Sequence, residues 1–223
     1  MSRRPARSRS SSFTLVELLI VIAVVVLLVA LAFPGLQLAR NYAIRTGSLS
    51  NMRQIGMGFL EYAGDNDGNL PGRTVGTSDK WPLLLTNYLG STHIYVAPGD
   101  LTAMKMTPAQ LVANSPNNTS YIFNGFNDQG AYTDPSFQLK LYGIPHPVSV
   151  ILLGQKLPGK GDFYMDFVEG NQINVIMTNA FTGGSNYVFA DGSARYLKTS
   201  QYNPIFWCVD TNYNIPAPPP GVH

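Results

Sequence analysis

The chain has 223 residues, of which 45% are hydrophobic and 13% charged, and its 15 Lys and Arg against 13 Asp and Glu give a formal net charge of +2. This hydrophobic share excludes disorder over most of the chain, and the charged share is about half of the roughly 25% typical of soluble domains. The small net charge excludes a nucleic-acid-binding protein with a broad basic face. The single cysteine, Cys208, excludes an intrachain disulfide and a cysteine-rich zinc site.

The first 33 residues combine a basic flank with an apolar run. Residues 1–12 contain four arginines and no acidic residue, and residues 18–33 are apolar without a break. As a helix, the stretch from Phe13 to Phe33 is about 31 Å long, which matches the hydrocarbon core of a bilayer. The basic flank predicts a single membrane span with a cytoplasmic N-terminus and an exported remainder.

Two positions in this segment carry specific expectations. Glu17 is its only charged residue, and a carboxylate at the centre of a membrane span costs up to about 3 kcal/mol on insertion scales. If the chain were cut before Phe13, the new α-amino group of a neighbouring copy could neutralise this carboxylate within the lipid. Pro34 removes one backbone donor, and with Gly35 beside it predicts a kink of the helix near the membrane exit.

The residues after Pro34 are expected to continue the helix in amphipathic form. Met52, Ile55, Phe59 and Tyr62 recur at steps of three and four, and a stop is predicted directly after them. We therefore expect a leader over residues 1–12, a transmembrane and assembly helix over 13–34, an amphipathic continuation over 35–63, a globular head over 64–215 and a proline-rich tail over 216–223.

The head has short apolar segments between turn signals, a pattern typical of short strands and long loops. Asp191-Gly192 between two alternating apolar runs predicts a type I′ hairpin turn. Short helices are predicted over residues 81–89 and near 108–113. Strands are predicted over Ser120–Asn124, Ser149–Leu153, Asn174–Met177, Asn186–Ala190 and Ala194–Lys198. The predicted fold class is α+β, with a long, kinked N-terminal helix packed on a small antiparallel sheet.

The start of the apolar segment resembles the class III signal of type IV pilins and type II secretion pseudopilins, in the residues Ser12-Phe13-Thr14-Leu15-Val16-Glu17-Leu18-Leu19-Ile20-Val21-Ile22. The resemblance implies cleavage between Ser12 and Phe13 by a prepilin peptidase, N-methylation of Phe13, an assembly role for Glu17 and the lollipop fold of pilins. One departure is Ser12, because the family usually has Gly before the cut.

The head is similar to one branch of pseudopilin-like proteins that is abundant in planctomycete and verrucomicrobial bacteria. This chain departs from the branch at Phe181, where a His is frequent, and at Ser48 and Ala97, where Cys is frequent. The similarity lies in segments within residues 50–71, 81–100 and 183–193.

One pattern in the head has the spacing of metal ligands. Asp65, Asp67 and Asn69 place oxygen atoms at alternate positions, as a calcium loop begins, but the following residues exclude an EF-hand. The alternative is a helix-terminating turn. Apart from this candidate Ca²⁺ site, no cofactor is expected. The sequence contains no P-loop, nucleophile elbow or H-E-x-x-H motif, and an enzyme is not expected.

Together these features predict a structural subunit of a type II secretion pseudopilus or a type IV pilus-like filament. After cleavage by the prepilin peptidase, the subunit would wait in the membrane lipid until an inner-membrane assembly platform adds it to other pilin-like subunits. The product would be a periplasmic or cell-surface filament, with no role for nucleic acid. The alternative, favoured by Ser12, is an uncleaved membrane-anchored binding or surface protein that does not polymerise.

Overall fold

The computed structural model describes residues 14–73, 80–103, 119–131, 134 and 137–217. The chain forms two compact units, residues 1–40 and residues 41–223. The predicted leader, the predicted helix near residues 108–113 and most of the proline-rich tail lie outside the described residues. The helices are α1 (Leu15–Asp65), α2 (Trp81–Leu84) and α4 (Asn171–Asn174), with 3₁₀ turns η1 (Thr92–Tyr95), η3 (Asn127–Gln129), η4 (Leu141–Gly143), η5 (Thr199–Gln201) and η6 (Pro204–Trp207).

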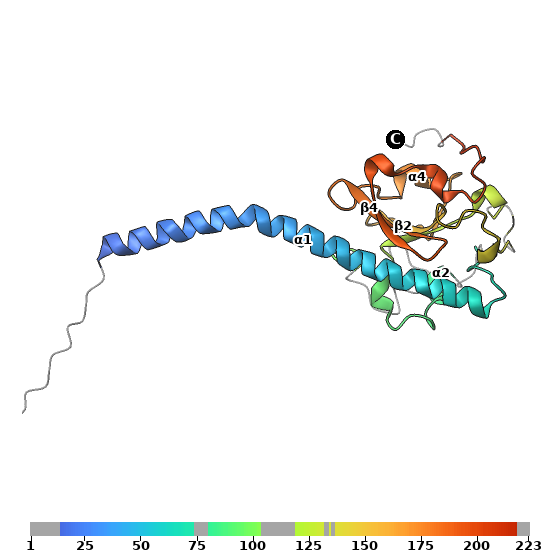
Figure 1. Cartoon of the computed structure of the whole chain (residues 1–223), viewed down its shortest axis with the longest axis horizontal. Coiled ribbons are helices and arrows are strands. Elements are labelled where there is room, and N and C mark those ends of the chain that lie inside the picture. Colours follow the sequence, from blue (N-terminus) through green and yellow to red (C-terminus); the bar gives the residue numbers. More distant parts are fainter. Residues whose placement is uncertain (1–13, 74–79, 104–118, 132–133, 135–136, 218–223) are drawn as a thin grey trace, which may run out of the picture. The chain divides into compact units, whose positions relative to one another are not determined.

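Helix α1 includes Pro34 in its interior and continues to Asp65 (Figure 1). Its side chains are exposed as far as residue 43, whereas from Ser48 onward the buried positions recur at helical spacing. These buried positions include Met52, Ile55 and Phe59, so the predicted amphipathic stripe is confirmed. The bend at Pro34 and Gly35 stays a prediction.

The head contains one sheet of five strands in the order β3-β1-β2-β4-β5. The strands are β1 (Tyr121–Asn124), β2 (Ile151–Gln155), β3 (Tyr164–Met165), β4 (Gly184–Phe189) and β5 (Ala194–Lys198). The sheet is mixed, because β3 joins β1 in parallel while the other neighbours are antiparallel. The α+β class is thus confirmed, with one parallel pair that the sequence pattern did not predict.

Four predicted strands are present as β1, β2, β4 and β5, with β2 displaced by two residues. The strand predicted over Asn174–Met177 is wrong. Asn174 ends the short helix α4, where its N–H donates to the Gly170 carbonyl, and Ile176 forms only an isolated bridge with Lys156. The predicted helix over residues 81–89 is present only as the four-residue α2.

Strands β1 to β4 are buried on both faces of the sheet, whereas the edge strand β5 is partly exposed. On one face, Tyr121, Phe123 and Val188 join the buried residues of α1 in a single core. On the other face, Ile122, Tyr187 and Phe189 pack with residues that include Trp207 and Cys208. This alternation is the period of two of β-strands, and only the register shift between Ile151 and Leu153 interrupts it.

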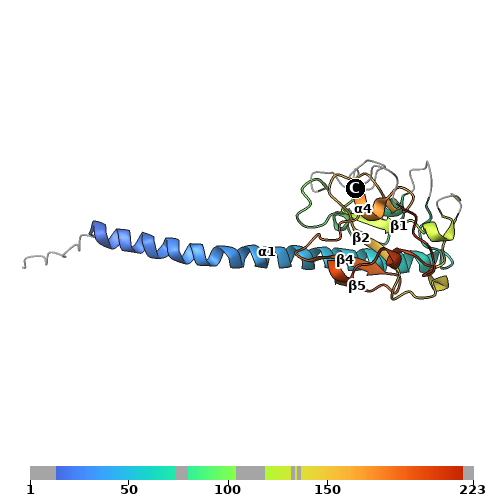
Figure 2. The same cartoon turned by 90° about the horizontal axis from the view of Figure 1, so that it is seen from above.

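Aromatic rings and a glycine allow α1 to lie close to the sheet. Phe59 of α1 stacks on Phe123 of β1 with ring centroids 4.5 Å apart, and Trp81 lies 5.7 Å from Phe59. A Cβ atom at Gly56 would lie 2.8 Å from Val188 Cγ1, so a larger residue would force the helix away from β4. Figures 1 and 2 show β4 and β5 beside this part of α1.

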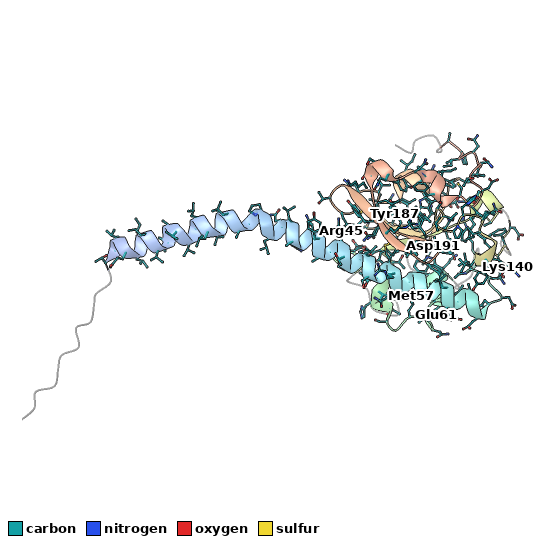
Figure 3. All side chains as sticks on the ribbon, in the orientation of Figure 1. Arg45, Met57, Glu61, Lys140, Tyr187 and Asp191 are labelled. Carbon is teal, nitrogen blue, oxygen red and sulfur yellow. The ribbon has the colours of Figure 1, made fainter. Side chains whose placement is uncertain are left out.

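The opposite side of this part of α1 carries exposed residues. Met57 is 48% exposed and Glu61 is exposed as well. Figure 3 shows both on the side of the helix that is turned away from the sheet. The helix after residue 41 is therefore one-sided, as expected of an element that covers one face of a core.

Candidate functional site

The described chain begins with a closed hydrogen-bonded turn formed by Thr14 and Glu17. The Glu17 N–H donates to Thr14 Oγ1 over 3.2 Å, and the Thr14 N–H donates to Glu17 Oε2 over 2.8 Å. The Thr14 hydroxyl also donates to Glu17 Oε2, at 2.8 Å. This reciprocal pattern is a capping box, with Thr14 as N-cap and Glu17 three residues later. The Thr-x-x-Glu spacing is a sequence signal for this box, but no capping box was predicted from it.

The capping box fixes where the carboxylate of Glu17 lies. It is held in the first turn of α1, where the helix dipole favours an anion. Both hydrogen bonds from Thr14 end on Oε2, and no hydrogen bond to Oε1 occurs among the described residues. Oε1 is thus able to accept a further donor. Ser12 and Phe13, the expected cleavage and methylation positions, lie outside the described residues.

Between this turn and residue 43, the side chains of α1 are exposed and are not covered by the chain itself. Phe33 and Leu36, on either side of Pro34 and Gly35, are 59% and 68% exposed. Within the described part of the chain, α1 is the one helix that is long and apolar enough to cross a membrane. The segment can therefore be buried only by lipid or by another molecule.

Asp191 and Gly192 form the predicted hairpin turn between β4 and β5, but its type is different. The Gly192 N–H donates to the Phe189 carbonyl, so the central residues are Ala190 and Asp191. A type I′ turn needs a positive φ at both central residues, and Asp191 has none, whereas Gly192 has φ 81°. Within this turn, Asp191 Oδ1 accepts hydrogen bonds from the N–H and the hydroxyl of Ser193.

The three calcium candidates lie where α1 ends. The Gly68 N–H donates to the Ala63 carbonyl over 2.8 Å, and Asp67 between them has φ 54°. This six-to-one bond with a left-handed residue before it is the Schellman arrangement that closes helices. The helix stop is thus confirmed. Calcium binding by Asp65, Asp67 and Asn69 stays a prediction, and within the described residues no group of three His, Cys, Asp or Glu side chains could hold a metal.

A buried polar network links α1 to the sheet, and no sequence signal pointed to it. Gln155 at the end of β2 donates from Nε2 to Ser48 Oγ over 2.5 Å, and Ser48 Oγ lies 3.4 Å from the hydroxyl of Tyr121. All three side chains are buried. Burial raises the pKa of Tyr121, so its hydroxyl stays protonated and available to the network.

Cys208 is a free, buried thiol, as expected. Burial raises the pKa of this thiol to about 12, with smaller contributions from Asp128 and Asp210. Since the thiolate is the reactive form of cysteine, Cys208 acts as a small apolar side chain of the second core.

The capping box gives a first prediction. Thr14→Ala should destabilise the first turn of α1 by about 1 kcal/mol, because the Glu17 N–H loses its acceptor. Hydrogen exchange at that amide, measured on the full chain in detergent micelles, should accelerate by about fivefold. Thr14→Ser is the matched control and should retain the protection, since serine also caps helices. Equal exchange in the alanine and serine variants would contradict the capping role.

The end of α1 gives a second prediction. Asp67→Gly should be at least as stable as the parent chain, with or without Ca²⁺, because glycine is the preferred residue at this left-handed position. Asp67→Ala should lose about 1 kcal/mol, since a Cβ without a polar partner is strained there. The measurement is chemical unfolding of the head followed by Trp fluorescence. A Ca²⁺-dependent gain in the parent that Asp67→Gly loses would instead assign a metal site to this loop.

Comparison with known families identifies the N-terminal region. Residues 7–33 match the prokaryotic N-terminal methylation motif. No match was found to a curated protein or to a solved structure. The matched segment ends at Phe33 and includes the capping box, so α1 begins within the motif. The chain therefore carries the N-terminal signal of a type IV pilin-like or pseudopilin-type protein, which indicates processing by a prepilin peptidase and single-pass membrane anchoring.

Proposed function

We propose that the protein is a structural subunit of a type II secretion pseudopilus or of a type IV pilus-like filament. One observation carries the proposal: the described part of the methylation motif lies on the start of α1, where the apolar side chains are exposed as far as residue 43 and the first turn holds one carboxylate. The buried residues of the two main hydrophobic cores of the head begin at Met52, so the exposed start of α1 supplies none of them. The segment is thus available for contacts with lipid and with other subunits.

In this proposal, the four arginines of residues 1–12 keep the N-terminus in the cytoplasm while the head is exported to the periplasm. The prepilin peptidase removes these residues and Phe13 is methylated. The mature chain keeps 11 basic and 13 acidic residues, so its slight excess of charge is negative. The apolar segment then holds the subunit in the inner membrane until the assembly platform extracts it.

Assembly replaces lipid by neighbouring helices around the apolar segment. Lipid tails are as apolar as Leu or Val side chains, so hydrophobicity alone gives little preference for the filament. Specificity must come from packing and from the charge of Glu17. We propose that the methylated amine of Phe13 in a neighbouring subunit donates to Glu17. A buried charge pair of this kind selects a register more securely than it adds stability.

The first test of the proposal is the N-terminus of the mature protein. Mass spectrometry of the chain isolated from its own membranes should find a methylated Phe13 as the first residue. An N-terminus at Met1 or Ser2 would overturn the processing step and support the uncleaved membrane-anchored protein instead. Ser12→Gly is the matched variant, because it restores the residue that usually precedes the cut and should be processed at least as completely.

The second test separates the two roles of Glu17. Glu17→Gln keeps a side chain that capping boxes accept but removes the charge, whereas Glu17→Val removes both. Both variants should insert in the membrane normally, and both should enter filaments about tenfold less well or worse, as expected for the loss of a charge-assisted contact. Incorporation is measured by immunoblotting of sheared filaments beside electron micrographs. Normal incorporation of Glu17→Gln would show that capping, rather than charge, explains Glu17.

A further inference from the structure

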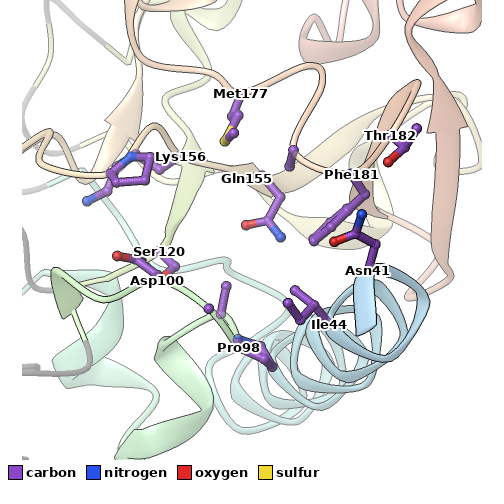
Figure 4. Close-up of a pocket in the computed structure, with 14 residues that line it drawn as sticks. Asn41, Ile44, Pro98, Asp100, Ser120, Gln155, Lys156, Met177, Phe181 and Thr182 are labelled. Atoms are coloured by element: carbon purple, nitrogen blue, oxygen red, sulfur yellow. Dashed lines mark hydrogen bonds between the residues drawn. The ribbon is translucent and has the colours of Figure 1, made fainter. Parts of the chain in front are cut away.

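The head contains a cavity of about 320 Å³ between the first residues of α1 in this unit, the end of β2 and two loops. Ligand-binding cavities in proteins begin at about this size, and a single water takes about 30 Å³. Figure 4 shows Gln155 reaching into this space, with Met177 on one side and Ile44 and Pro98 on the other. The proposed filament contacts of residues 13–33 leave this cavity without a role.

Two buried charged side chains line the cavity, and they do not meet. Lys156 is 3% exposed and Asp100 is 8% exposed. Within the described part of the chain, Lys156 makes no ion pair, and its Nζ makes a single hydrogen bond, to the Asp162 carbonyl at 3.0 Å. An ammonium group has three donors, so two of its N–H groups lack a protein acceptor in this region.

Asp100 is fixed in place by neutral donors. Its Oδ2 accepts from the hydroxyl of Ser120 at 2.6 Å, and its Oδ1 accepts from the N–H groups of Thr102 and Ala103 at 3.1 and 3.2 Å. These bonds orient the carboxylate but supply no positive charge. The cavity thus presents one rigid anion and one buried cation, and among the described residues neither is in direct contact with an opposite charge.

The rest of the lining is apolar or uncharged. Ile44, Pro98, Met177 and Phe181 supply apolar surface, while Gln155 is tied to Ser48 through one of its two amide hydrogens. Burial lowers the pKa of Lys156 to about 8, against the opposing charges of Asp162 and Asp100. A buried ammonium in such surroundings gains more from an anionic partner than an exposed one does.

We infer that this cavity binds a free α-amino acid with an apolar side chain, its carboxylate directed to Lys156, its ammonium to Asp100 and its side chain to the Met177 and Phe181 wall. A zwitterion of this kind supplies both missing charges at once. A simple carboxylic acid would leave Asp100 unpaired, and a simple amine would leave Lys156 unpaired. A peptide chain end would bring only one of the two charges.

The test uses the full chain in detergent micelles and equilibrium dialysis with radiolabelled L-leucine. Saturable binding is expected, and two matched probes should compete about tenfold less well or worse, since each lacks one charged contact. These probes are 4-methylpentanoate, which is leucine without the amino group, and 3-methylbutylamine, which is leucine without the carboxylate. Absence of saturable leucine binding, or equal competition by either probe, would overturn the inference.

Variants locate the binding site. Lys156→Met, which keeps the length of the side chain, should weaken leucine binding about tenfold or more, and Lys140→Met is the matched control at an exposed lysine outside the cavity. If Lys156→Met fails to fold, Thr182→Trp tests the same point, because Thr182 is exposed and lines the cavity. The bulky ring should block entry and abolish binding. Unchanged affinity in a folded Lys156→Met or in Thr182→Trp would place the leucine elsewhere and overturn the inference.

Discussion

The rest of the structure depends on how the exposed apolar surface of α1 is kept out of water. From Leu15 to Leu38, α1 exposes large aliphatic side chains on every face, and none of them is covered by the chain. Transfer of each such side chain out of water lowers the free energy by about 1.5–3 kcal/mol, so the segment cannot remain hydrated. For a chain with a pilin-like signal at residues 7–33, the surroundings that can bury this segment are membrane lipid and the helices of neighbouring subunits.

The same helix meets a different requirement after residue 41. There it must cover one face of a sheet that is also buried on its other face. Gly56 lets the backbone of α1 approach Val188, and Phe59 fills the space up to Phe123. The outward positions, such as Met57 and Glu61, are exposed and do not cover the sheet (Figure 3). One continuous helix therefore carries two patterns of hydrophobicity, apolar on all sides and then apolar on one.

These two patterns are what the sequence could reveal, because periodicity reports burial directly. The stripe of Met52, Ile55 and Phe59 was predictable for that reason. The parallel strand β3 was not, since two residues carry no period and their pairing with β1 is set by chain topology. The turn at Asp191-Gly192 was placed correctly, but its type was not, because Asp191 lacks the positive φ that a type I′ turn requires. The network of Ser48, Gln155 and Tyr121 joins residues more than 70 positions apart and leaves no local signal.

In the first turn of α1, the Glu17 side chain contributes to helix formation and, in the proposed assembly, to a contact between subunits. A helix that starts within lipid has N–H groups that water cannot satisfy, and the Thr14–Glu17 capping box satisfies two of them. Hydrogen bonding from Thr14 does not remove the charge of Glu17, however, and it leaves Oε1 available. In the proposed assembly, the residue that closes the helix within a subunit therefore also accepts a cation from a neighbouring subunit. A glutamine could also close the turn, whereas only the carboxylate supplies the negative charge that the helix dipole favours and that the proposed contact with Phe13 of a neighbouring subunit uses.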